Sequence, residues 1–142
     1  VFMSQIKSER ASWVSPYIIV ENLEKAIKFY QEAFKFDLLD QMNSESDGSI
    51  IHAEMAYKDQ LIMFGKALVW GQKPLPPKMS GIECPITQYI YVENVDEFYD
   101  HALKNGAKSD SAPEDMFWQD RMCSLIDIDG YKWSFATNIS QV

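Results

Sequence analysis

The sequence predicts an α+β fold made of two similar β-α-β-β-β modules in tandem. The first observation is a repeat, because the residues Tyr-Ile-Ile-Val-Glu-Asn at 17–22 return as Tyr-Ile-Tyr-Val-Glu-Asn at 89–94. The second is that each copy opens onto an apolar stripe with helical spacing, and the third is that strand-like segments follow each stripe. One such unit is too small to bury its hydrophobic face alone, so the two must pack or pair. We therefore expect one structural domain whose functional site lies where the modules meet.

The first module is predicted at residues 15–66. Residues 17–20 are β-branched and aromatic, which is typical of a strand, and Asn22 then supplies an N-cap for a helix whose apolar positions run to Phe34. Turn signals at Asp47-Gly48 and Lys58-Asp59 separate the segments that follow. The strands expected there are residues 37–42, 50–57 and 61–64.

Residues 67–85 form the predicted connector between the modules. This segment and its border carry the breakers Gly71, Pro74, Pro76, Pro77, Gly81 and Pro85. Neither a helix nor a central strand tolerates such a density of Pro and Gly.

The second module is predicted at residues 86–142. After a strand at 86–92, Asn94 caps a helix that has Glu97 at its third position and that ends at Asn105-Gly106. Residues 108–117 include Pro113 and are expected to form an irregular or edge strand. Two strands, at 121–127 and 131–137, flank the hairpin turn Asp129-Gly130.

Residues 1–14 remain as an N-terminal arm. Trp13 indicates that this arm docks on the protein, since an exposed indole is costly to leave unburied.

The charge balance limits the classes of partner. The chain carries 13 Lys plus Arg against 21 Asp plus Glu, a net charge of -8. Such a surface repels nucleic acid and anionic membranes, and it suits a neutral or cationic small ligand better than an anionic one, although surface acidity more often serves solubility. No apolar stretch approaches the roughly 20 residues that span a bilayer, and the start lacks a secretory pattern, so we expect a soluble, cytoplasmic protein.

The two cysteines suggest no metal or redox chemistry. Cys84 and Cys123 lie far apart, and neither has a second Cys or His at a short metal-ligand spacing. Idle thiols in a reducing compartment are the simplest interpretation.

Four segments, at residues 26–34, 51–55, 117–121 and 127–133, resemble the PhnB-like branch of the vicinal oxygen chelate superfamily. That superfamily includes glyoxalase I, the bleomycin and fosfomycin resistance proteins and extradiol dioxygenases. The resemblance implies a curved mixed sheet that encloses a cavity, often across a homodimer made by exchanging halves. One departure is Lys35, where relatives usually place Gly after the first helix; a left-handed backbone there would cost about 1 kcal/mol.

Metal-dependent members of this superfamily place a ligand near the start of the first strand and one in the last strand of each module. Carried onto this chain, those positions are Ser15, Phe64, Thr87 and Ser134. Phe cannot donate an electron pair, and neutral hydroxyls are poor ligands for divalent transition metals. A one-residue slip in the alignment would bring in Gln88 as a ligand but would not complete a site. The resemblance therefore implies a protein that uses no metal and no other cofactor.

The orientation of the other residues in these strands follows because side chains alternate between the two faces of a sheet. If the ligand positions face the cavity, so do Tyr17, Ile19, Ile62, Tyr89, Tyr91, Lys132 and Ala136. The helices are then faced by Ile18, Val20, Ile90, Val92, Trp133 and Phe135. Such a cavity would hold a flat or apolar ligand by ring stacking; alternatively, the aromatic rings simply fill the space themselves.

His52 and Glu54 share one face of a strand, so that a metal-free general acid or base is conceivable, although a hydrogen-bonded structural pair is the commoner use of such residues. Trp118, Asp120 and Arg121 lie just before a strand, where they either gate the cavity or close a turn through an Arg-Asp pair. The predicted ligand-binding residues are Ser15, Tyr17, Ile19, His52, Glu54, Ile62, Phe64, Thr87, Tyr89, Tyr91, Trp118, Arg121 and Ser134.

Three functions remain open on the sequence. The first is a metal-free, homodimeric small-molecule-binding protein, drug sequestration included. The second is a divergent glyoxalase-type lyase or isomerase, or a dioxygenase, that depends on a metal held elsewhere or on His52 and Glu54. The third is a structural or partner-binding module with a self-filled cavity.

Overall fold

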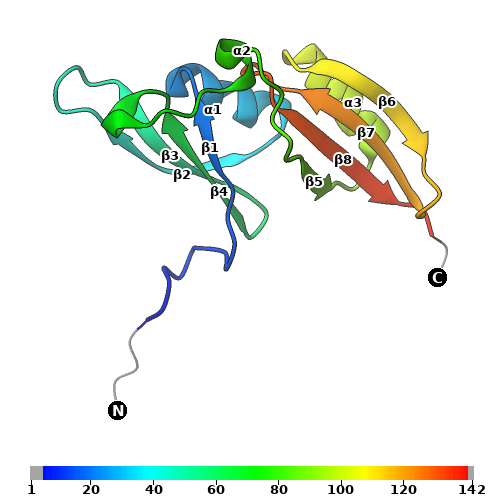
Figure 1. The fold of residues 1–142 in the computed structure, drawn as a ribbon. Helices are drawn as coiled ribbons and strands as arrows, with labels where there is room; N and C mark the ends of the chain where they lie inside the picture. Colours follow the sequence, from blue (N-terminus) through cyan, green and yellow to red (C-terminus); the bar gives the residue numbers. More distant parts are fainter. Residues whose placement is uncertain (1–4, 141–142) are drawn as a thin grey trace.

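The computed structural model describes residues 5–140 and forms two four-stranded mixed sheets, each with a helix packed on one face (Figure 1). In the first sheet the strand order is β1-β4-β3-β2, and β1 runs parallel to β4. The two sheets do not join into a closed barrel within the described residues. The elements of this module are β1 (Tyr17–Val20), α1 (Leu23–Ala33), β2 (Asp37–Asn43), β3 (Ile50–Tyr57) and β4 (Gln60–Lys66).

The second sheet repeats the arrangement with the order β5-β8-β7-β6, and β5 runs parallel to β8. The strand that carries Pro113 lies at the edge of this sheet, as predicted, because an edge strand can lose one backbone donor without losing a ladder bond. The predicted α+β class is confirmed. The elements of this module are β5 (Gln88–Tyr91), α3 (Val95–Lys104), β6 (Lys108–Asp115), β7 (Asp120–Ile126) and β8 (Lys132–Asn138).

Both long helices begin at the predicted asparagine caps. The side-chain oxygen of Asn22 accepts a hydrogen bond from the backbone N–H of Lys25 at 2.9 Å, and that of Asn94 accepts one from Glu97 at 3.2 Å. Lys35, just past the end of α1, has a φ of 59° and so occupies the left-handed conformation in which relatives are expected to carry Gly. Within residues 5–140, no helix combines the length and the apolar character that crossing a membrane requires.

The connector contains more regular structure than its composition predicts. It forms a short 3-10 turn, η1 (Val69–Gly71), and a single-turn helix, α2 (Pro77–Ser80). Pro77 occupies the first turn of α2, where its missing N–H and fixed φ cost nothing, and Gly81 ends the turn with a φ of 74°. The expectation that no helix forms here is therefore wrong for one turn, because Pro excludes a helix interior but favours a helix start.

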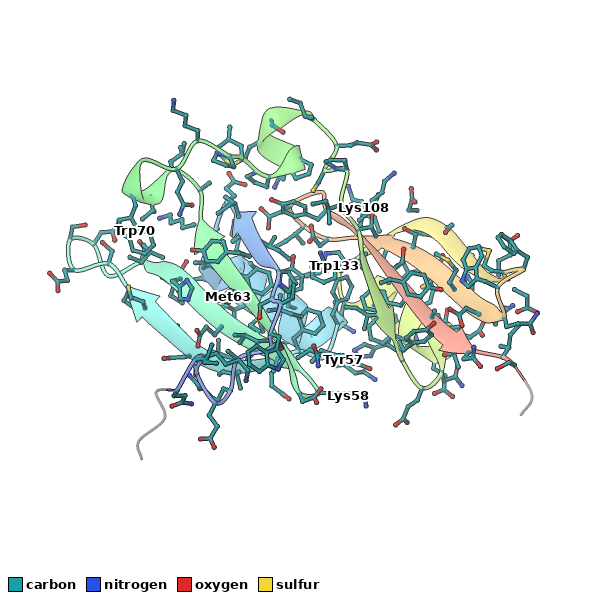
Figure 2. The ribbon with its side chains drawn as sticks, turned by 60° about the horizontal axis from the view of Figure 1, so that its bottom comes forward. Tyr57, Lys58, Met63, Trp70, Lys108 and Trp133 are labelled. Carbon is teal, nitrogen blue, oxygen red and sulfur yellow. The ribbon has the colours of Figure 1, made fainter. Side chains whose placement is uncertain are left out.

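The hydrophobic core is shared by the two modules. The centre of the Phe34 ring, just past the end of α1, lies 4.8 Å from that of Phe135 on β8. The ring centres of Tyr30 and Trp133 lie 5.6 Å apart, and the central position of Trp133 is visible in Figure 2. The Tyr30 hydroxyl also donates to the buried carboxylate of Asp127, which accepts a second bond from the indole of Trp133 at 2.8 Å. The predicted orientation of Trp133 and Phe135 toward the helices is confirmed.

The described part of the N-terminal arm touches the first sheet through polar groups. The guanidinium of Arg10 lies 3.3 Å from the carboxylate of Glu54, and the hydroxyl of Ser12 accepts a bond from the backbone N–H of Leu61 at 2.9 Å. Trp13, however, is 77% exposed, and the ammonium of Lys7 lies 5.0 Å from the centre of its ring. The described part of the arm therefore contacts the protein as expected, but the expected reason is wrong, because polar side chains hold it and the indole of Trp13 stays exposed. Residues 1–4 lie outside the described part of the chain.

Candidate functional site

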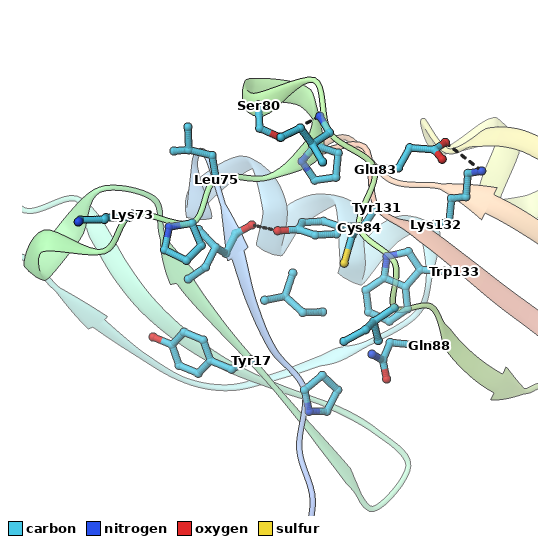
Figure 3. Close-up of a pocket in the computed structure, with 17 residues that line it drawn as sticks. Tyr17, Lys73, Leu75, Ser80, Glu83, Cys84, Gln88, Tyr131, Lys132 and Trp133 are labelled. Carbon is cyan, nitrogen blue, oxygen red and sulfur yellow. Dashed lines mark hydrogen bonds and ion pairs between the residues drawn. The ribbon is translucent and has the colours of Figure 1, made fainter.

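A groove of about 610 Å³ runs between the modules under the connector (Figure 3). The backbone of β1 forms one wall, the start of β5 and β8 forms the other, and the connector crosses above them. Its lining is largely apolar, as is usual for small-molecule sites. The side chains used below are Tyr17, Ile19, Cys84, Tyr131 and Trp133.

A second groove, of about 520 Å³, opens at the other end of the same seam. It is lined by residues that precede β1, by the hairpin tip between β3 and β4, and by β5. Pro16, Gln88 and Trp133 line both grooves, so the two hollows border one inter-module seam. The second groove contains Ser15, Ile62, Tyr89 and Tyr91 from the predicted set.

The wall of the first groove is fixed by hydrogen bonds between the modules. Tyr131 donates its hydroxyl to the carbonyl oxygen of Ile19 at 2.7 Å, and the carboxylate of Asp129 accepts the backbone N–H of Glu21 at 2.9 Å. Burial raises the pKa of Asp129 to about 6, and the nearby negative charges of Asp127 and Glu21 act in the same direction. The β7–β8 turn therefore fixes the end of β1 through these two hydrogen bonds.

On the open face of the first sheet, Tyr17 lies across Gly65. A Cβ atom added at Gly65 would meet the Tyr17 hydroxyl at 2.5 Å, so the tyrosine ring occupies the space that a side chain would need. This position brings the Tyr17 hydroxyl to 3.5 Å from Nδ1 of His52. Glu54 shares that face but is engaged by Arg10 at 3.3 Å. His52 and Glu54 therefore lie on one face as predicted, while each contacts a different partner.

On the open face of the second sheet, two tyrosines converge on one carboxylate. Tyr89 and Tyr91 donate their hydroxyls to the same oxygen of Asp120, at 2.7 and 2.8 Å, and the indole of Trp118 donates to the Tyr89 oxygen at 3.0 Å. These donors hold the pKa of Asp120 below its ordinary value, the Tyr89 bond acting most strongly. The pKa of Tyr89 is raised chiefly by burial, and that of Tyr91 chiefly by its bond to Asp120, so both phenols stay protonated.

The predicted orientation of Ile62 and Phe64 is wrong. Both side chains belong to the buried core, where the Phe64 ring packs 4.7 Å from that of Tyr30, although Ile62 also borders the second groove. The register explains the error: Tyr17 pairs with Met63, while the equivalent Tyr89 pairs with Ser134. Met63, not Phe64, is thus the counterpart of Ser134 on the open face.

With Met63 in place of Phe64, the implied positions still carry no suitable set of metal ligands. The positions at which the resemblance implies ligands become Ser15, Met63, Thr87 and Ser134. Three neutral hydroxyls and one thioether do not fit a divalent transition metal, which prefers imidazole, carboxylate or thiolate. Among residues 5–140, His, Cys, Asp and Glu form no group of three that could hold a metal ion.

Arg121 takes no part in either groove. Its guanidinium bonds Asp96 at the start of α3 at 2.8 Å and Asp115 at 3.0 Å, and these two bonds raise its pKa. An Arg-Asp pair does join the two ends of the β6–β7 turn, but it uses Asp115 and not the adjacent Asp120, which accepts hydrogen bonds from the tyrosines instead. Thr87 is exposed and Ser134 is buried, and neither borders the two grooves.

Four residues of these sites lie outside the predicted ligand-binding set: Asp120, Cys84, Gln88 and Tyr131. Of these, the sequence predicts Asp120 only in a turn or gate beside Arg121, and Gln88 only as a possible metal ligand. Asp120 could have been found from alternation along β7, because Met122 pairs with Ala136 and Asp120 with Asn138, on the face that also carries Ser134. Nothing local indicated Cys84 or Tyr131, which reach the groove only when the connector and the β7–β8 turn pack on β1.

Comparison with known proteins agrees with this architecture. The model of the Glyoxalase/Bleomycin resistance protein/Dioxygenase superfamily matches residues 10–135. An uncharacterized protein from Mycobacterium bovis is 30% identical over 132 residues, which cover 91% of this chain and 85% of that protein. The chain therefore belongs to the glyoxalase/bleomycin resistance protein/dioxygenase superfamily.

Solved structures of similar fold include two that bear on function. TioX from Micromonospora sp. ML1 has a TM-score of 0.70 and 20% identity, over 90% of this chain and 99% of TioX. TnmS3, described as an antibiotic binding protein from Streptomyces sp. CB03234, has a TM-score of 0.65 and 20% identity, over 87% of this chain and 93% of TnmS3.

Proposed function

We propose that this chain is a metal-free, cytoplasmic small-molecule-binding protein that holds a flat, largely apolar ligand along the seam between its modules. The observation that carries the proposal is the pair of grooves, of about 610 and 520 Å³, at the two ends of that seam, which are lined by aromatic and aliphatic side chains. The antibiotic-binding description of TnmS3, which has a similar fold, supports the same class of function.

We further propose that the protein is a homodimer. Both sheets carry apolar side chains on the face away from the helices, and Tyr17, Met42, Tyr89 and Tyr91 are each more than two-fifths exposed. A second copy that covers these faces would bury this surface and enclose the ligand. Native mass spectrometry of the protein as purified should give a dimer mass, and it should also reveal any co-purifying small molecule.

Nile red, a neutral and flat aromatic dye, provides a direct test of the groove. Cys84 lines the first groove, whereas Cys123 is buried in the core, where burial raises its thiol pKa to about 11. We expect saturable dye fluorescence, and we expect the bound dye to slow alkylation of Cys84 by iodoacetamide while Cys123 stays unmodified throughout. Dye that neither fluoresces nor protects Cys84 would favour the self-filled module.

Two variants test whether the Nile red signal comes from the first groove. Tyr17→Ala removes a ring from the groove wall and should weaken dye binding several-fold. Trp70→Ala removes an exposed ring from the connector that lines neither groove, and it should leave the affinity unchanged.

A second candidate function is metal-free acid/base catalysis. The 3.5 Å approach of the Tyr17 hydroxyl to Nδ1 of His52 favours it, because a histidine beside a phenol on an open face can pass a proton to a bound substrate. Catalysis would use His52 with Tyr17 rather than with Glu54. Once a turnover is found, His52→Ala should abolish it while leaving ligand affinity intact; equal loss of affinity and turnover would assign His52 to binding alone.

A further inference from the structure

Outside the two grooves, the most unusual feature is the carboxylate of Asp120. It is only 1% exposed, and it accepts hydrogen bonds from Tyr89, Tyr91 and, at its other oxygen, the amide of Asn138 at 3.1 Å. All three donors are neutral. None of the ion pairs within residues 5–140 includes Asp120, and the adjacent Arg121 is committed to Asp96 and Asp115. A nearly buried negative charge therefore stands without a cationic partner, which is an unusual arrangement for an ionised side chain.

The side chains linked to this charge by hydrogen bonds belong to a cluster of aromatic rings. The rings of Tyr89 and Tyr91 meet edge-on with their centres 5.6 Å apart, and Phe117 meets Trp118 at 4.9 Å in the same manner. These rings remain partly or largely exposed. The face of an aromatic ring attracts a cation through its quadrupole, and attraction to the nearby carboxylate of Asp120 adds to it.

The hydrogen bonds of the two tyrosine hydroxyls also favour a cation over an anion. Tyr89 donates to Asp120 and accepts from Trp118, whereas Tyr91 donates to Asp120 and keeps its acceptor capacity. Neither phenol has a proton left for an anionic ligand. The aromatic cluster can therefore receive a donor or a cation, and it offers little to a carboxylate or phosphate.

We propose that Tyr89, Tyr91 and Trp118, backed by Asp120, form a cation-binding wall that receives an alkylammonium or quaternary ammonium group. Tyr89 and Tyr91 also line the second groove, so the cationic group of a ligand would sit here while its apolar body lies along the seam. The proposal rests on the proposed small-molecule-binding function and adds the charge of the ligand to it.

Two probes of nearly equal shape separate charge from shape. The cation is (4-hydroxyphenyl)trimethylammonium, and its neutral isostere is 4-tert-butylphenol; both are titrated into the full-length protein by isothermal calorimetry. We expect the cation to bind roughly tenfold more tightly than the isostere. In Asp120→Asn, which keeps the size of the side chain, this preference should disappear while the affinity of the isostere stays within about twofold.

Three further variants complete the test. Trp118→Leu removes an exposed ring and should lower the cation affinity several-fold even if Asp120→Asn fails to fold, as circular dichroism would reveal. Tyr91→Phe keeps the ring and should retain most of the preference. Asp100→Asn removes one exposed charge from α3 and serves as the charge-matched control, with the preference unchanged.

The outcomes separate this proposal from the proposed function. If both probes bind equally and Asp120→Asn changes neither, the cation-binding wall is refuted while binding at the seam stands. If neither probe binds but Nile red does, the wall is refuted in the same way. If Tyr91→Phe and Trp118→Leu change the oligomeric state seen by native mass spectrometry but leave the preference for the cation unchanged, the rings belong to a subunit interface and the proposal fails.

Discussion

Tyr131 donates its hydroxyl to the carbonyl oxygen of Ile19 across the boundary between the modules, at 2.7 Å. Tyr57 makes the reciprocal contact, donating to the carbonyl of Tyr91 at 2.9 Å. Ile19 and Tyr91 occupy the same position of the repeated segment, and both donors lie at the tip of a hairpin between the third and fourth strands of a module. Each module thus holds the first strand of the other by one phenol, which keeps the seam at a fixed width.

Removing these hydroxyls should loosen the seam. Tyr131→Phe and Tyr57→Phe each leave a backbone carbonyl without its partner, and each should lower the free energy of unfolding by about 1 kcal/mol. The double variant should show the sum, since the two bonds lie at separate hairpin tips and share no partner. Urea denaturation measures the change. Tyr99→Phe, which removes a bond to Ser109 within the second module, is the control for loss of a phenol elsewhere.

Asp129 should make stability depend on pH. Its folded pKa is about 6, raised chiefly by burial, against about 3.9 for an unfolded Asp. Between these values the folded state binds more protons than the unfolded state, so this group's contribution is fully present below about pH 4 and is lost as the pH rises through about 6. The loss amounts to up to about 3 kcal/mol.

Asp129→Asn checks this assignment. The amide oxygen can still accept the N–H of Glu21, but the side chain no longer titrates. In the wild type, the free energy of unfolding should fall as the pH rises from 4 to 7.5. In the variant, we expect this fall to be absent. An unchanged pH profile would show that Asp129 is not the titrating group.

Lys35 should be a site of easy stabilisation. Its φ of 59° places an L side chain in the left-handed region, so Lys35→Gly relieves strain and should raise the free energy of unfolding by about 1 kcal/mol or slightly less. Lys28→Gly, on the exposed side of α1, should instead lower it by about 1 kcal/mol, because Gly in a helix interior is unfavourable. Destabilisation by both substitutions would contradict the strain argument. Thermal and urea unfolding provide the measurement.

Gly65→Ala should displace Tyr17. The new Cβ would lie 2.5 Å from the tyrosine hydroxyl and 2.9 Å from its ring, so the side chain must swing away from His52. We expect the NMR signals of the His52 ring to shift and Nile red binding to weaken. In a Tyr17→Ala background the same substitution should have little effect, because the clash is gone. A wild-type His52 spectrum in Gly65→Ala would show that the phenol does not rest there.

Much of the fold could be predicted from local signals. The repeat, the asparagine caps and the alternating segments each depend on residues a few positions apart, and the observed helices and strands follow them closely. The faces of β1, β5 and β8 were also predictable, since Trp133 and Phe135 alternate with Ser134. In β4 the residues from Leu61 to Phe64 are all apolar, so alternation carries no information there.

The sequence by itself determined two modules, their element order and a set of positions with poor metal ligands. The tertiary structure decided which face of β4 looks outward, because pairing with β1 and β3 sets the register of a strand whose two faces are both apolar. It also decided the partners of charged groups: Asp120 with Tyr89 and Tyr91, and Arg121 with Asp96, lie 25 to 31 residues apart in the chain. Such contacts depend on how separate elements pack in space, and no spacing within one element encodes them.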